Sequence, residues 1–141
     1  MQSEIKYLGH KISHEGLSVH SDQFEPVLKA ATPRTRKELQ KFLGFISYFR
    51  SFTPNFAEIC EPMIQLLKNN SPYVWSNEVQ TSFDKIKSEI VVSGKLVYPD
   101  FSKPFIIKTD ASLHSIGAAL CQERNNVICP VYFISRSLNE V

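Results

Sequence analysis

The chain has 141 residues, a formal net charge of only +2 and an ordinary apolar content of 43%, which indicate one ordinary folded domain or two small ones. No apolar run approaches the ~20 residues of a membrane span, and the N-terminus lacks a signal-peptide pattern. We therefore expect an intracellular protein, cytoplasmic or nuclear, that binds no membrane. The three cysteines, Cys60, Cys121 and Cys129, lack C-x-x-C spacing, which argues against a disulfide framework and a zinc site.

The first 20 residues have the pattern of a β-hairpin. β-Forming side chains run through Ile5–Ile12, Ser13–Gly16 is a turn with glycine where a positive φ costs little, and Leu17–Val19 returns. Because an isolated hairpin is only marginally stable in water, we expect this piece to be the end of a larger sheet. His10 and His14 are expected at the surface, since a spacing of four does not bring side chains together in a hairpin.

The next segment carries the clearest helix signal in the chain. After a short helix predicted over Asp22–Ala31, Thr35 and Glu38 form a capping box in which each side chain serves a backbone amide. Gly44 costs roughly 1 kcal/mol relative to alanine in mid-helix, so we expect a close neighbour there, either another helix or a nucleic-acid strand. Apolar residues follow the cap at helical spacing, at Leu39, Phe42, Leu43, Ile46 and Phe49.

Basic residues are concentrated in the same segment. Residues 29–50 hold six of them against one acid, which gives the segment a net charge of +5: Lys29, Arg34, Arg36, Lys37, Lys41 and Arg50 against Glu38. A basic cluster on a near-neutral chain indicates a surface that faces a polyanion, with a solvated helix face as the alternative.

Two further helical segments are predicted before the pattern changes. Asn55 is a capping residue for a helical segment over 56–68, which Pro62 is expected to divide in two. A longer helix follows over 76–93. The change from helical to strand periodicity then predicts a linker and a domain boundary near 94–101.

Residues 103–135 predict short antiparallel strands. An apolar run at Phe105–Ile107 leads to Asp110, small residues follow at Ile116–Leu120, and Val127–Ser135 is rich in β-formers. Asp110 has two interpretations: aspartate often starts a turn, and a carboxylate at a strand end beside glycine and alanine also suits a divalent-metal site. With no helix predicted over these strands, one face of the sheet is uncovered, and we expect further structure to complete it.

Four blocks of residues occur in a recognisable order. They are Tyr7-Leu-Gly-His10 with Glu15-Gly16-Leu17, Leu39-x-x-Phe42-Leu43-Gly44 with Tyr48-Phe49-Arg50-x-Phe52-x-Pro54-Asn55-Phe56, Trp75 with the Phe83 helix, and Tyr98-Pro99-Asp100-Phe101 with Thr109-Asp110-Ala111-Ser112. In order and spacing they resemble the thumb–connection–RNase H region of reverse transcriptases from retroviruses and gypsy-type LTR retrotransposons, over nearly the whole chain.

The resemblance implies an α+β fold in four parts. Residues 1–20 correspond to the end of the palm, a β-hairpin, and residues 21–70 to a small helical thumb bundle. Residues 71–100 correspond to the connection. Residues 101–141 correspond to the N-terminal part of an RNase H-like domain, with the first three antiparallel strands of an incomplete RNase H-like fold.

The resemblance also implies two sets of site residues. Asp110 falls on the first metal-binding, catalytic carboxylate of RNase H, a fold whose complete sites use Mg²⁺ ions and several carboxylates to cut RNA in an RNA–DNA hybrid. The thumb lies along the primer–template duplex, and a grip that accepts any sequence uses phosphate contacts. The residues predicted to bind nucleic acid are Arg34, Arg36, Lys37, Gln40, Lys41, Gly44 and Arg50.

Catalysis by this chain alone is not expected. The family's polymerase site needs paired aspartates, and the sequence has no Asp-Asp pair; one carboxylate cannot organise two Mg²⁺ ions. We expect a fragment of a retrotransposon Pol polyprotein whose parent performs reverse transcription and RNA cleavage. Its partners would be the palm and fingers upstream and the remaining RNase H and integrase downstream. The alternative is a retained module that binds nucleic acid or protein without catalysis.

Overall fold

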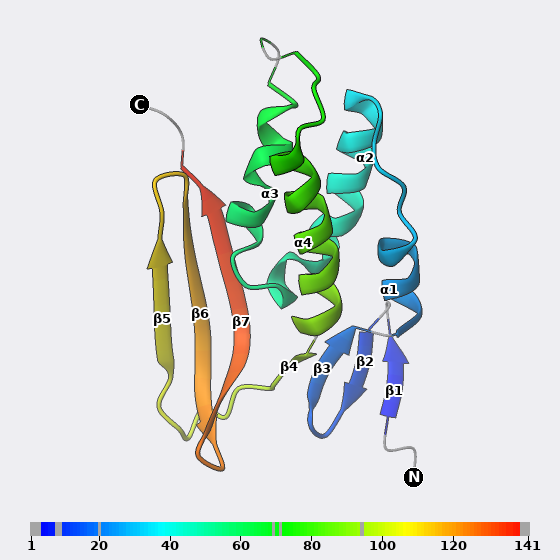
Figure 1. Cartoon of the computed structure of the whole chain (residues 1–141). Coiled ribbons are helices and arrows are strands. Elements are labelled where there is room, and N and C mark those ends of the chain that lie inside the picture. Colours follow the sequence, from blue (N-terminus) through cyan, green and yellow to red (C-terminus); the bar gives the residue numbers. More distant parts are fainter. Residues whose placement is uncertain are drawn as a thin grey trace.

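The computed structural model describes residues 4–7, 10–19, 21–68, 70, 72–93 and 95–138. A group of helices packs beside two antiparallel sheets, a small one near the N-terminus and a larger one at the C-terminal end (Figure 1). The fold is therefore α+β, with a helical bundle followed by three C-terminal strands, as the sequence predicts.

The N-terminal sheet has four strands in chain order. They are β1 (Glu4–Tyr7), β2 (His10–Ser13), β3 (Gly16–Val19) and β4 (Lys95–Leu96). The single strand predicted over 5–12 is wrong, because the chain folds back within it and pairs Ile5 with Ile12; residues 8 and 9 lie outside the described residues. A meander of paired strands gains stability that an isolated two-stranded hairpin lacks.

β4 corrects the prediction of a linker over 95–101. It pairs with β3 by placing Leu96 opposite Leu17, and the Leu96 side chain is buried. Gly16 makes this pairing possible, because it adopts a φ of +146° and a Cβ there would collide with the Leu96 carbonyl. The N-terminal sheet is thus closed by a strand from far along the chain.

The helical region consists of α1 (Ser21–Leu28), α2 (Arg36–Ile46), the 3₁₀ helix η1 (Ser47–Phe52), α3 (Phe56–Gln65) and α4 (Asn77–Ser93). The capping box of α2 is confirmed. Thr35 Oγ1 accepts a hydrogen bond from the Glu38 amide at 3.2 Å, and the Glu38 carboxylate accepts one from the Arg34 amide at 2.7 Å.

The hydrophobic core lies among the helices and centres on α4. Phe83 of α4 is only 2% exposed, and its ring lies 4.8 Å from that of Phe42 and 5.7 Å from that of Trp75. Buried apolar side chains from the rest of α4 and from the other elements join this cluster: Val27, Leu39, Ile46, Phe49, Phe52, Phe56, Ile59, Cys60, Met63, Leu66, Val79, Ile86, Ile90 and Leu96. The apolar faces that the sequence predicts for α2 and α4 are therefore the faces that pack in the core.

α3 departs from the prediction in two ways. Pro62 lies inside one continuous helix, because proline removes a single backbone hydrogen bond while the buried side chains of the same helix hold it in place. Asn55 adopts a left-handed φ of 50° and makes no side-chain capping bond. The amide of Ala57, one of the first amides that a helix leaves unpaired, donates instead to Ser135 Oγ at 3.0 Å.

The C-terminal sheet contains β5 (Ile106–Ala111), β6 (Ser115–Arg124) and β7 (Val127–Ser137), in that order. The predicted strands are confirmed, and Asn125 and Asn126 make the turn between β6 and β7 with positive φ. One face packs on α3 and η1. Alternation places Ile107 and Ile134 on the other face, where they are 69% and 60% exposed.

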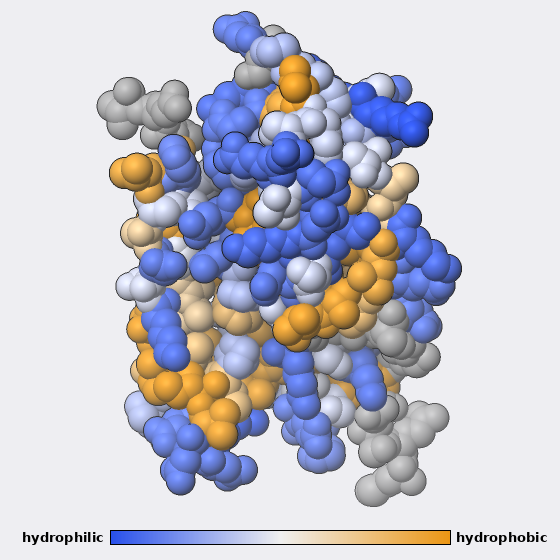
Figure 2. All heavy atoms as spheres, in the orientation of Figure 1, coloured by the Kyte–Doolittle hydropathy of each residue, from blue (hydrophilic) through white to orange (hydrophobic). Residues whose placement is uncertain are grey.

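The exposed apolar side chains are visible at the surface. In the space-filling view they gather over the C-terminal sheet at the left, whereas hydrophilic side chains cover the front of α4 (Figure 2). Among the described residues, this sheet therefore has one covered face and one open face, as expected from the sequence.

The position of Phe83 makes it a test of the core. We expect Phe83→Ala to lower the free energy of unfolding by about 3–5 kcal/mol, because it removes a buried ring and leaves a cavity. Val92→Ala on the same helix is the matched control, since Val92 is 82% exposed. Urea denaturation followed by circular dichroism measures both, and equal midpoints for the two variants would contradict the assignment of Phe83 to the core.

Candidate nucleic-acid interface and carboxylate site

The outer face of α2 brings together four of the predicted nucleic-acid-binding residues. Lys37, Gln40, Lys41 and Gly44 are all exposed, and their spacing of three and four residues puts them on one side of the helix. Nothing in the described chain outside the helix itself lies within 4 Å of the position that a Cβ would take at Gly44. The alternative that another helix packs against Gly44 is therefore wrong, and this face is open to a partner.

The arginines of the basic segment have different positions. Arg36 Nη1 donates to the carbonyls of Leu66 and Lys68 at 2.5 and 2.8 Å, so it holds the end of α3. Arg50 donates to the Ser135 carbonyl, and its guanidinium lies 5.8 Å from the centroid of the Phe56 ring. The structure thus gives these two predicted binding residues intramolecular contacts. Arg34 is exposed just before α2 begins.

Tyr48 extends the α2 face into η1 and is held by the N-terminal sheet. Its hydroxyl lies 3.1 Å from Nε2 and 3.2 Å from Nδ1 of His10. The His10 ring stacks on Phe52 with centroids 5.4 Å apart, so His10 is a half-buried residue near the surface that contacts two aromatic rings. Burial raises the pKa of Tyr48, which keeps the phenol protonated at neutral pH.

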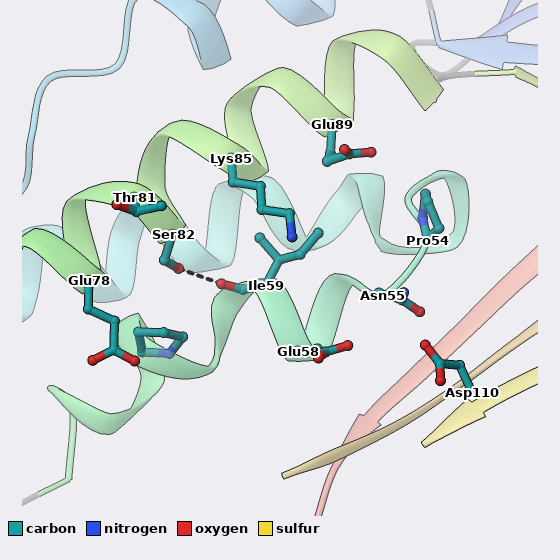
Figure 3. Close-up of a pocket in the computed structure, with 11 residues that line it drawn as sticks. Pro54, Asn55, Glu58, Ile59, Glu78, Thr81, Ser82, Lys85, Glu89 and Asp110 are labelled. Atoms are coloured by element: carbon teal, nitrogen blue, oxygen red, sulfur yellow. Dashed lines mark hydrogen bonds between the residues drawn. The ribbon is translucent and has the colours of Figure 1, made fainter. Parts of the chain in front are cut away.

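Asp110 lies near the end of β5 on the covered face of the C-terminal sheet. It pairs with Gly117 of β6, which pairs in turn with Ser135 of β7. Its carboxylate points toward Asn55 at the start of α3 (Figure 3). A Cβ at Gly117 would come within 2.8 Å of Asn55 Oδ1. The small residue beside Asp110 therefore does admit a close neighbour, as the sequence indicated, and that neighbour is the Asn55 side chain.

A groove of about 760 Å³ separates Asp110 from α3 and α4. Ser82 of α4 donates to the Ile59 carbonyl of α3 along this groove (Figure 3). Its charged lining is mostly acidic: Glu58, Glu78, Glu89 and Asp110 against Lys85. The side chains around Asp110 therefore disfavour an anionic ligand unless cations offset their charge.

The described residues do not by themselves form a metal centre. No group of three or more His, Cys, Asp or Glu side chains among them is placed to hold a metal ion. Because Mg²⁺ needs an octahedral set of oxygen ligands, Asp110 supplies at most a part of a two-ion site. No helix in the described part of the chain is long and apolar enough to span a membrane.

Residues 75–141 match the family model for the RNase H-like domain found in reverse transcriptase. Two relatives from Drosophila melanogaster, the retrovirus-related Pol polyproteins from transposons 412 and 297, are each 34% identical to the chain. The alignments cover 97% and 99% of this chain but 11% and 13% of those polyproteins. The chain thus spans about a tenth of the length of these curated relatives.

Solved structures with the same fold come from a foamy virus. The protease-reverse transcriptase dRH in complex with double-stranded DNA has a TM-score of 0.81 and 26% identity, covering 99% of this chain and 25% of that one. The same enzyme in complex with an RNA/DNA hybrid has a TM-score of 0.77 and 27% identity, covering 97% and 19%. The fold is thus that of a reverse-transcriptase region.

The chain belongs to the Pol polyproteins of retrotransposons and contains their RNase H-like region. The match at 75–141 includes α4 as well as the C-terminal sheet. The division of the chain at 20, 70 and 100 stays a prediction.

Ser135 tests the junction that positions Asp110. We expect Ser135→Ala to lower the free energy of unfolding by about 1–3 kcal/mol, because it leaves the buried Ala57 amide without an acceptor. Ser137→Ala, two residues along the same face of β7, is the control. Thermal denaturation compares the two, and equal losses of stability would show that the bond to Ala57 contributes nothing.

Proposed function

We propose that the outer face of α2 holds a primer–template duplex or an RNA–DNA hybrid. The main support for this proposal is the open surface at Gly44. It lies with Lys37 and Lys41 on one side of a rigid, capped helix. Amine groups that neutralise phosphates bind duplexes of any sequence. Gly44, which follows Lys41 on the same face, lets a nucleic-acid strand approach the helix backbone.

Gln40 and Arg34 fit the same role. Gln40 is exposed between the two lysines and offers both a donor and an acceptor to a groove. Arg34 is exposed before the first turn of α2 and supplies a further positive charge. The foamy virus enzymes with this fold are described in complex with double-stranded DNA and with an RNA/DNA hybrid, which supports the same class of partner for this chain.

We also propose that Asp110 is one carboxylate of the Mg²⁺ site of an RNase H, with the other ligands supplied by the rest of a Pol polyprotein. Its place near the end of β5, facing an open groove, supports this role. The parent protein would perform reverse transcription and cut the RNA of a hybrid. The chain by itself would bind nucleic acid and leave it intact.

Duplex binding through α2 predicts a defined effect of charge reversal. We expect Lys37→Glu with Lys41→Glu to weaken binding to a blunt RNA–DNA hybrid at least tenfold and to reduce the slope of log K against log salt by about 2, because two phosphate contacts are lost. Fluorescence anisotropy over a range of salt concentrations measures both quantities.

The control for this double variant has the same change in net charge at another surface. Lys103→Glu with Arg136→Glu alters two exposed basic side chains away from α2 and from the Asp110 groove. If both double variants weaken binding equally, the attraction is a general effect of charge and the α2 face is not the binding surface.

A cleavage assay tests the proposal for Asp110. The purified chain is incubated with an RNA–DNA hybrid and Mg²⁺, and we expect the RNA to stay intact because one carboxylate does not organise two ions. Asp110→Asn is the matched control. Cleavage by the unchanged chain that disappears in Asp110→Asn would show that this chain completes a nuclease site by itself.

A further inference from the structure

A second groove opens where η1 meets the edge of β7. Its volume is about 320 Å³, and it is lined by Ser47, Tyr48, Arg50, Ser51, Tyr132, Phe133, Ile134 and Ser135. Tyr48 belongs both to this groove and to the end of the α2 face. A nucleic-acid strand that follows α2 toward its C-terminal end therefore reaches this groove next.

The lining has the chemistry of a site for single-stranded nucleic acid. Tyr48 and Tyr132 are 39% and 48% exposed, so their rings are available to stack on bases. Arg50 and the hydroxyls of Ser47 and Ser51 provide polar groups for the strand backbone. The described residues that line this groove include no acid, in contrast to the groove beside Asp110.

Tyr48 and Arg50 are already held in place in this groove. The Tyr48 hydroxyl lies 3.1 Å from His10 Nε2, and the Tyr48 ring meets Phe49 edge-on at 5.1 Å. Arg50 is anchored by its bond to the Ser135 carbonyl. A guanidinium has five N–H donors, so this anchor leaves others for a ligand. Fixing the side chains in advance lowers the entropy that binding has to overcome.

We propose that this groove, which runs round the edge of β7 from Tyr132 on the open face of the sheet to Arg50 of η1, binds an unpaired nucleotide of a single strand, with the base stacked on Tyr132 and the phosphate near Arg50. The volume lies at the lower end of the roughly 300–1,000 Å³ typical of small-ligand sites, which suits one nucleotide. This inference rests on the proposed function only where it assumes that a strand reaches the groove along α2. A single strand that is not part of a duplex binds the groove directly.

Tyr132 gives the sharpest test, because it lies on β7 and away from the α2 face. The probes are a fluorescent oligo-dT of about twelve nucleotides, within the site sizes known for single-strand binders, and a blunt DNA duplex of the same length. We expect Tyr132→Ala to weaken binding of oligo-dT about tenfold and to leave duplex binding unchanged. Tyr132→Phe keeps the ring and should retain the affinity of the unchanged chain for oligo-dT.

Ile128→Ala is the matched control on the same strand, since Ile128 is exposed and lies outside the groove. Circular dichroism of each variant checks that it folds. The proposal is overturned if the unchanged chain does not bind oligo-dT, or if Tyr132→Ala binds it as well as Ile128→Ala does. A failure of the proposed function gives a different result, because the unchanged chain then does not bind the duplex.

Discussion

The contact on which most of this structure depends is the one between the helices and Ser135. Its hydroxyl accepts the Ala57 amide at the start of α3, and its carbonyl accepts Arg50 from η1. One residue of β7 thus accepts hydrogen bonds from a helix-terminal amide and from a guanidinium. A buried amide left unpaired at this junction would lower the stability of the fold. Because Ser135 shares a row of the sheet with Gly117 and Asp110, the same contact fixes where the carboxylate faces α3.

This junction separates two surfaces of opposite character. On one side, the α2 face and the groove at Tyr48 and Arg50 present amines, a guanidinium and aromatic rings. On the other, the groove at Asp110 is lined mainly by carboxylates. Electrostatics favours an anionic ligand at the first surface and disfavours it at the second. In the proposed function, a hybrid would therefore approach Asp110 only where cations offset its acidic neighbours.

The sequence predicts the elements that local rules determine. The capping box at Thr35, the long helix over α4 and the three C-terminal strands each have a periodic pattern and clear ends. Two of the errors, at β4 and at the cap of α3, concern interactions between distant residues. Asn55 is a typical capping residue by its type, but the cap of α3 comes from Ser135, which lies 78 residues beyond the Ala57 amide that it accepts. No local pattern distinguishes a serine that caps a distant helix from one that simply ends a strand.

The basic segment shows why charge counting predicts a site only in part. Six basic residues in 29–50 suggest a uniform phosphate-binding surface, yet Lys29 pairs with Glu25 and two of the arginines hold backbone carbonyls. The division follows the chemistry of the side chains, because a planar guanidinium fork holds carbonyls well whereas a lysine amine on a flexible stem faces solvent. The positive charge left for a ligand at α2 is thus mainly that of Lys37 and Lys41 on the helix and of Arg34 just before it. Duplex binding by this helix should accordingly have the salt dependence of about three phosphate contacts and not of six.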